Sequence, residues 1–512
     1  MLLIHRISIL CFFVLAGGTM QSLCQNVLPA YPTANWKDVN SLRINVTEPC
    51  DSVDILAYGG DNTGVTSNNT ALSNAINFLK TTGKTGIVLF PAGTYLFTDS
   101  VNLSDSIILK GSGAASTTLR FVMGGTGSLI TVIGGAGSDT TKIIGTALKN
   151  MYKARVADVS KFQVGDIVKL TEKDSDLIYS NWAYGVVGQI MEIKSITGDS
   201  IEFKSSMRIQ YPALRNPYIR KLNMKKNVGI SCLKIVRGDN VTDSFKYSNI
   251  VFNYTANCWL NGVHSDSTFF THVDLSHSYR NIITSCYFTN AYEYGGDGRA
   301  YGIACQATSS ENLIVDNIFK KLRHAMLLQT AANGNVFSYN YSRETFWVEG
   351  IFPPDVSGDI VCHGNYPFSN LFEHNVVQNI IIDNSHGVNG PYNLLFRNRA
   401  ENVGIFMNAG AGDSTNFIGN EVTKPASGFY GFYALTGNGN FTYGNNTQGN
   451  PQPPGTSSLT DSTYYTSGRP SFFTGTWPAI GYPQLINSGT LPSITRYNAN
   501  NFTVCNSLIN YS

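Results

Sequence analysis

Short apolar runs recur between asparagines in the second half of the chain. The segments NLIVDNIF, NVFSYNYS, NLFEHNVV and NLLFRNRA begin at Asn312, Asn335, Asn370 and Asn393, and each carries a second asparagine five positions later. The interval is 23 residues from Asn312 to Asn335, from Asn370 to Asn393, and from Asn393 to Asn416. A repeat of this length, built from short apolar runs and turn residues, predicts the stacked coils of a parallel β-solenoid.

The repeated asparagines have a structural explanation in such a stack. One coil cannot bury its apolar face alone, so successive coils are expected to place equivalent side chains above one another. Asparagines repeated once per coil can then form a ladder, in which each amide bonds the backbone and the amide of the next coil. This interpretation makes Asn393 and Asn398 structural rather than catalytic. The Leu-x-x-Leu-x-Leu spacing of a leucine-rich repeat is missing.

A different pattern precedes the repeats. The stretch TALSNAINFLK has apolar residues at helical spacing, at Ala71, Leu72, Ala75, Ile76 and Leu79, and predicts a short amphipathic helix. The following GIVLFPAGTYLF predicts a strand, a turn and another strand. A helix followed by strands suits a cap over the open N-terminal end of a solenoid.

These segments carry a family resemblance. AYGGDNTGVTSNNTALSNAI, followed by VLFPAGTYLF, resembles the opening of the pectate-lyase-like β-helix proteins, a secreted superfamily often labelled as related to family-28 glycosidases. The resemblance extends more generally over the repeats from about Asn249 to Asn420. It implies an all-β fold, a right-handed parallel β-helix with an N-terminal helix-and-strand cap. It does not fix the activity, because the superfamily includes lyases, hydrolases, epimerases and phage tailspikes.

Composition and strand alternation divide the chain into five predicted segments. Residues 1–24 are a signal peptide, and residues 50–150 form the cap and the first coils. Residues 151–210 alternate as VSKFQVGDIVKL and VVGQIMEIKSITGDSIEFKSS, which predicts a small β insert. Residues 211–425 form the main parallel β-helix with the active-site groove. Residues 426–512 are rich in turn-forming residues and predict irregular C-terminal coils or a cap.

The N-terminus has the layout of a secretory signal. Arg6 precedes an apolar stretch from Ile7 to Ala16, which is too short to span a bilayer. Cleavage near Cys24 would release a secreted or periplasmic protein. A lipid anchor on Cys24 is the weaker alternative, because the preceding QSL fits a lipobox poorly.

The low charge and the scattered cysteines argue against several classes of protein. Charged residues make up 14% of the chain and the formal net charge is +2, which argues against a nucleic-acid partner. No later segment has the apolar length of a membrane span. The sequence has no closely spaced CxxC pair, so we do not expect a structural zinc site. The oligomeric state is left open. Buried thiols are expected at Cys258, Cys286, Cys305 and Cys362.

Two long loops, residues 291–302 and 343–359, interrupt the repeat and combine aromatic with acidic residues. Function on a β-helix is expected from outward side chains of one sheet and from the loops beside it. Aromatic faces that stack on sugar rings, with carboxylates nearby, suit a saccharide groove. The predicted substrate-binding residues are Tyr292, Tyr294, Arg299, Gln329, Trp347 and Asn389.

The predicted catalytic residues come from these loops and from the segments around the asparagine units. His363 and His386 stand seven residues before the next unit, and Gln306 and Gln329 stand six before it. We therefore expect these four side chains to stack in one column. The catalytic candidates are Arg323, His324, Glu349, Asp355, His363, Asp383, His386 and Arg397.

Three functions fit this set. β-Elimination at a uronate needs a cation to neutralise the substrate carboxylate and a base to remove the C5 proton, and the many Arg and His candidates favour it. Hydrolysis needs a pair of carboxyl groups. The SHG at Ser385 is similar to a Gly-His-Gly element of polygalacturonases, but their Asn-Thr-Asp, Asp-Asp and Arg-Ile-Lys elements are missing. A non-catalytic glycan-binding adhesin would share the fold. The sequence has no clear cluster of acidic residues that would predict a metal site. Ca2+ is the one cofactor that stays as an alternative.

Overall fold

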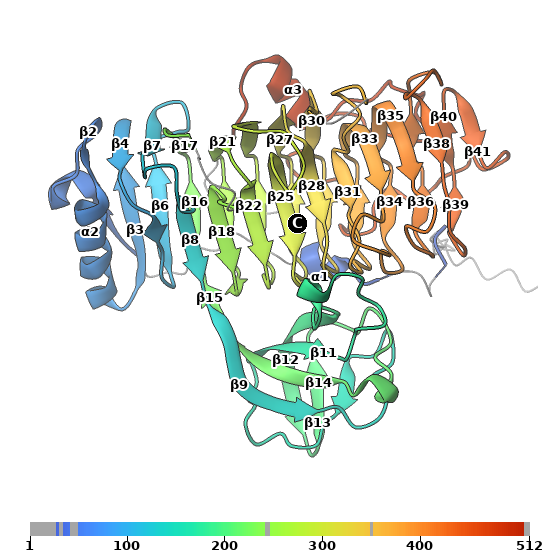
Figure 1. Ribbon diagram of the computed structural model, residues 1–512, viewed down its shortest axis with the longest axis horizontal. Helices are drawn as coiled ribbons and strands as arrows, with labels where there is room; N and C mark the ends of the chain where they lie inside the picture. The colour runs from blue at the N-terminus through green and yellow to red at the C-terminus, as the bar shows by residue number, and fades with distance from the viewer. Residues whose placement is uncertain (1–26, 30–33, 41–49, 241–245, 349–351, 506–512) are drawn as a thin grey trace, which may run out of the picture.

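The computed structural model describes residues 27–29, 34–40, 50–240, 246–348 and 352–505. Strands dominate, and they wind into a right-handed parallel β-helix whose coils follow one another along the long axis of the molecule (Figure 1). The predicted fold class is confirmed. The predicted signal peptide lies outside the described residues.

One face of the β-helix is a parallel sheet of 12 strands. Its strands explain the apolar runs after each asparagine, because both sides of the sheet are covered. In β26, Ile314 points into the central core, whereas Leu313 and Val315 join a second apolar cluster with residues of the C-terminal segment. The strands in order are β1 (Cys50–Asp54), β3 (Thr85–Phe90), β6 (Ile107–Gly111), β16 (Gly229–Ser231), β20 (Trp259–Asn261), β23 (Ile282–Thr284), β26 (Leu313–Val315), β29 (Val336–Ser338), β32 (Leu371–Glu373), β34 (Leu394–Phe396), β36 (Asn416–Ile418) and β39 (Thr442–Tyr443).

The two other faces join into one sheet of 21 strands. They join because β33 (Val376–Ile382) and β35 (Arg399–Met407) are long enough to pair with strands of both faces. The second face contains β2 (Thr63–Ser67), β4 (Gly93–Phe97), β7 (Thr117–Phe121), β17 (Lys234–Arg237), β21 (His264–Thr268), β24 (Tyr287–Ala291), β27 (Ile318–Lys320), β30 (Tyr341–Arg343), β37 (Glu421–Val422), β40 (Asn445–Thr447) and β41 (Asn450–Gln452). The third face contains β5 (Val101–Asn102), β8 (Ile130–Ile133), β18 (Ile250–Asn253), β22 (Thr271–Ser276), β25 (Tyr301–Gln306), β28 (His324–Leu328), β31 (Ile360–Cys362) and β38 (Phe432–Ala434).

The predicted asparagine ladder is confirmed, and it is double. The Nδ2 of Asn312 donates to Oδ1 of Asn335 at 2.8 Å, and bonds of the same kind continue to Asn370 and Asn393. All of these amides are buried, and each finds a partner in the next coil, as buried polar groups require. The second ladder contains Asn317, Asn340, Asn375, Asn398, Asn420 and Asn445.

The two ends of the chain cover the β-helix. Helix α2 (Asn69–Thr82) buries the five predicted apolar positions and lies at the N-terminal end of the coils (Figure 1). After β41 the chain returns along the outer side of the 12-stranded sheet and includes α3 (Pro492–Asn498). A disulfide between Cys232 and Cys505 links the end of this C-terminal segment to the β-helix. The four cysteines predicted as buried thiols are free and buried.

The small β insert is a six-stranded antiparallel sheet that hangs from one side of the β-helix (Figure 1). It spans residues 135–223, wider at both ends than the predicted 151–210. Its strands are β9 (Gly135–Lys142), β10 (Lys153–Arg155), β11 (Ile167–Thr171), β12 (Gly188–Thr197), β13 (Ser200–Phe203) and β14 (Tyr218–Asn223). The remaining elements are the strands β15 (Lys225–Lys226) and β19 (Thr255–Ala256), the helix α1 (Lys37–Asn40) and the 3-10 helices η1 (Ile55–Tyr58), η2 (Asn181–Ala183) and η3 (Ala213–Arg215).

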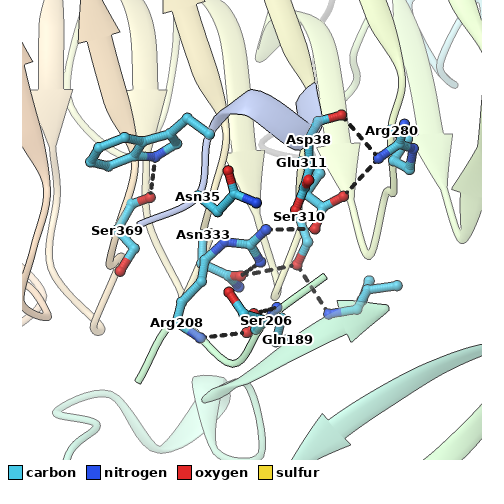
Figure 2. Close-up of polar contacts among 12 residues, drawn as sticks. Asn35, Asp38, Gln189, Ser206, Arg208, Arg280, Ser310, Glu311, Asn333 and Ser369 are labelled. Atoms are coloured by element: carbon cyan, nitrogen blue, oxygen red, sulfur yellow. Dashed lines mark hydrogen bonds and ion pairs between the residues drawn. The ribbon is translucent and has the colours of Figure 1, made fainter. Parts of the chain in front are cut away.

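Buried charges fasten the insert to the β-helix (Figure 2). Arg208 of the insert pairs with Glu311 at 2.5 Å and donates to Oδ1 of Asn333 at 3.1 Å. Arg280 reaches the other carboxylate oxygen of Glu311 at 3.1 Å. Burial alone would raise the pKa of Glu311, but the two guanidinium groups hold this pKa below its usual value. The insert is therefore docked at a fixed place beside the third face.

Candidate functional site

Three histidines form a row on the third face of the β-helix, and we call them the histidine row. His324 begins β28, His363 directly follows β31, and His386 lies in the turn after β33. The ring centroids of His324 and His363 are 5.8 Å apart, and those of His363 and His386 are 4.9 Å apart. Parallel pairing of the strands thus brings together three side chains, the first and last of which are 62 positions apart in the sequence.

His363, the middle ring, is bonded to a carboxylate. Its Nδ1 lies 2.7 Å from Oδ2 of Asp383. The backbone N–H of Ser385 donates to the other oxygen of Asp383 at 2.9 Å, which fixes the orientation of the carboxylate. Burial opposes the charge on Asp383, but the hydrogen bond to His363 keeps the pKa of Asp383 below its ordinary value. Asp383 is therefore set to remain ionised and to orient the imidazole.

The hydrogen bonds also define the free ring nitrogens. Nδ1 of His324 lies 2.8 Å from the carbonyl oxygen of Gly358. Carbonyl and ionised carboxylate oxygens only accept, so Nδ1 carries a proton in both His324 and His363. Neither Nε2 has a hydrogen-bond partner within the described part of the chain. Burial, with the charge of Arg323 nearby, lowers the pKa of His324 to about 3.

A cationic side chain, Arg323, lies beside the His324 end of the row. Arg323 stacks over the rings of Tyr301 and Trp347, at 5.9 Å and 5.5 Å, and donates from Nη1 to the carbonyl of Gly295 at 2.9 Å. At the other end of the row, burial lowers the pKa of His386. A bound anion would meet the positive charge of Arg323 at the His324 end of the row.

The predicted column is correct for three of its four members. The strand register aligns Gln306, Gln329 and His363 one above the other, and Gln329 donates to Gln306 at 2.6 Å. The fourth place belongs to Asp383 rather than His386, because Cys362 pairs with Ile382 in the next coil. His386 reaches the row from the turn that follows.

The structure contradicts a catalytic role for Arg397. This side chain is fully buried, and its guanidinium donates to the carbonyl oxygens of Asp461, Ile480 and Tyr482 in the C-terminal segment. Arg399, a weaker candidate, is also buried and pairs with Glu421 at 2.7 Å. Both guanidinium groups fasten the C-terminal segment to the β-helix.

The two long loops pack against each other beside the row. The rings of Tyr294 and Phe346 meet edge to face at 5.1 Å. Tyr294 donates to the carbonyl of Lys321, and Tyr292 to that of Arg237, so both hydroxyls are occupied by backbone. Trp347 faces Arg323, as described above.

Other predicted residues have supporting positions. Asn389 is buried and bonds the carbonyl of Asp383, so it holds the turn rather than binding substrate. Arg299 pairs with Glu293 of its own loop. Asp355 accepts hydrogen bonds from Tyr430 and Asn402, outside the histidine row. Glu349 lies outside the described residues.

Sequence reasoning missed an aromatic group from the insert. The ring of Trp182, in η2, meets that of His386 edge to face at 5.6 Å. Tyr179 packs against Gly387 in the same turn. The signal was present as YSNWAY, three aromatics within six residues of a surface loop, but nothing local placed this loop beside the row.

Two general findings concern ions and membranes. In residues 27–505, apart from the undescribed gaps, no group of three or more His, Cys, Asp or Glu side chains is arranged to hold a metal ion. No helix among them is long and apolar enough to cross a membrane.

Comparison with known proteins identifies the family. A family model described as rhamnogalacturonase A/epimerase, pectate lyase-like, matches residues 52–352, more than half of the chain. The match includes Arg323 and His324 but ends before His363 and Asp383. No significant match to a curated protein was found.

Similar solved structures include phage tailspikes. Tailspike gp49 of Pseudomonas phage LKA1 has 15% identity and a TM-score of 0.53, over 73% of this chain and 64% of the tailspike. Tailspike gp61 of Pseudomonas phage phi297 has 14% identity and a TM-score of 0.49, over 77% and 65%. The chain thus aligns with less than two thirds of either tailspike. At this identity the first likeness shows the fold alone.

Proposed function

Because the chain belongs to the rhamnogalacturonase A/epimerase, pectate lyase-like family, we propose that it is a secreted enzyme that cleaves an acidic polysaccharide by β-elimination at uronate residues. The family and the fold support activity on polysaccharides. The observation that carries the finer proposal is the His363–Asp383 contact at 2.7 Å, within a row that has Arg323 beside one end. Export is proposed from the signal-like N-terminus.

His363 is the proposed base. Its Nε2 takes the proton from C5 of the bound uronate, the electrons of the C5–H bond form a C4–C5 double bond, and the C4–O bond to the next sugar breaks. The protonated imidazole then returns the proton to the leaving oxygen, so no water is consumed. Asp383 holds the Nδ1 proton of His363 and stabilises the imidazolium, as a buried carboxylate does in other His–Asp pairs.

Arg323 is the proposed partner of the uronate carboxylate. Neutralising this carboxylate makes the C5 proton more acidic, because the negative charge that develops beside it is then stabilised. Arg323 is fixed for this role by its two aromatic neighbours and its bond to Gly295. His324 and His386, whose pKa values are lowered by burial, are neutral near pH 7 and add no second charge to the row.

Hydrolysis is the second candidate, favoured by the rhamnogalacturonase in the family description. It requires two carboxyl groups that act across one glycosidic bond. Asp383 is engaged with His363, and Asp355 with Tyr430 and Asn402. This engagement ranks hydrolysis below elimination.

The test is an assay on rhamnogalacturonan, polygalacturonate, alginate and a neutral α-glucan. Elimination creates an unsaturated uronate that absorbs in the ultraviolet, together with new reducing ends. We expect both signals on an acidic polymer, and neither with His363→Ala. Reducing ends without the absorbance would replace elimination by hydrolysis. No product on any polymer would favour a non-catalytic glycan-binding protein.

A further inference from the structure

A loop of the insert brings exposed aromatic side chains to the end of the histidine row. Trp182 is 61% exposed and Tyr179 is 76% exposed, although both touch the turn that carries His386. Trp182 meets His386 with only the edge of one ring. Large exposed apolar side chains gathered beside polar groups mark an interaction surface rather than a core.

The loop is held firmly although its aromatic rings are exposed. The carboxylate of Asp174 accepts from the backbone N–H groups of Gly185 and Val187, at 2.8 and 2.9 Å. The N–H of Ser180 donates to Oδ1 of Asn365 on the β-helix at 3.1 Å. Asn365 lies two residues after His363, so the contact links the loop directly to the row. A loop backbone held in this way loses little conformational freedom when a ligand stacks on its side chains.

A continuous series of ring–ring and cation–π contacts crosses the third face. From Trp347 they pass through Arg323 and Tyr301 to the histidine row, and from His386 to Trp182. The row therefore has an aromatic side chain from a β-helix loop at one end and aromatic side chains from the insert at the other. An extended chain of sugars that contacts His363 would meet both.

We propose that Trp182 and Tyr179 form a sugar-stacking subsite, which binds a pyranose ring of the substrate chain next to the uronate cleaved at His363. This inference rests on the proposed function and specifies which part of the protein selects the substrate. A pyranose presents C–H groups on its face, and these pack on an aromatic ring. The insert is then a specificity element, and removing its aromatic rings weakens binding without changing the base.

The test separates binding from turnover. Binding of rhamnogalacturonan and polygalacturonate oligosaccharides to His363→Ala is measured by calorimetry, and Trp182→Ala is added in that background. We expect a three- to tenfold weaker affinity for long oligosaccharides, about the value of one aromatic contact, and no change for a single uronate. Trp182→Phe is expected to retain most of the affinity.

Tyr152→Ala is the matched control. Tyr152 is an exposed aromatic of the same insert, 40% exposed, but it faces a separate cleft lined by Trp36 and Tyr464. The Tyr152→Ala variant should leave the affinity unchanged. Thermal denaturation reports whether each variant folds. Equal affinity with and without the Trp182 ring, or no binding of either polymer by His363→Ala, overturns the subsite. Trp182-dependent binding without cleavage by the wild type overturns the elimination and retains the subsite.

Discussion

At the scale of single residues, the contact with Asp383 separates His363 from the other two histidines. Hydrogen bonding fixes its proton on Nδ1 and leaves Nε2 to face the substrate. His363→Ala should therefore lower kcat by about 10²- to 10⁴-fold, the usual contribution of a general base. Asp383→Asn should lower kcat less and leave KM nearly unchanged. Steady-state kinetics on the active polymer measures both, and a His363→Ala variant with near wild-type kcat would contradict the assignment.

The ladder asparagines give a prediction of the opposite kind. Asn398 accepts from Asn375 and donates to Asn420 and to the carbonyl of Phe372, all inside the protein. Asn398→Ala leaves these groups without a partner and should lower the free energy of unfolding by about 1–3 kcal/mol. Chemical denaturation measures this loss. Activity per folded molecule should stay constant, and a fall in kcat at full folding would show that the ladder is not merely structural.

At the scale of elements, the docking of the insert depends on buried charge. The folded-state pKa of Glu311 is held below its unfolded value, so its contribution to stability is complete above that unfolded value and is lost as the pH falls through the folded one. The contribution of Asp38 to stability depends on pH in the opposite direction. Burial raises the pKa of Asp38 to about 6, so its contribution to stability declines as the pH rises towards that value.

Glu311→Gln isolates the contribution of Glu311. The variant should be less stable than the wild type at pH 7, because Arg208 and Arg280 lose their partner. The difference should shrink on acidification below about pH 4.3, where the unfolded carboxylate is protonated. Thermal denaturation of both proteins between pH 3 and 7 measures it. A stability difference that does not change with pH would mean that the charge of Glu311 does not stabilise the docking.

At the scale of the whole molecule, periodic features could be predicted from the sequence and distant contacts could not. The 23-residue interval of Asn370 and Asn393 reports a property of every coil, so it revealed the fold, the ladder and the histidines that share a face. Trp182 lies more than 200 residues before His386, and Arg397 contacts Ile480 in a segment that follows the repeats. Their places depend on how the insert and the C-terminal segment dock, which leaves no periodic trace.

The central claim is that this face of the β-helix eliminates rather than hydrolyses, with His363 moving one proton from C5 to the leaving oxygen. Cleavage of the active polymer in water labelled with the heavy oxygen isotope tests it most directly, with mass spectrometry of the products. Elimination predicts unlabelled fragments whose new non-reducing ends are lighter than hydrolysis products by one water. Incorporation of labelled oxygen during bond cleavage, with saturated ends, would contradict it.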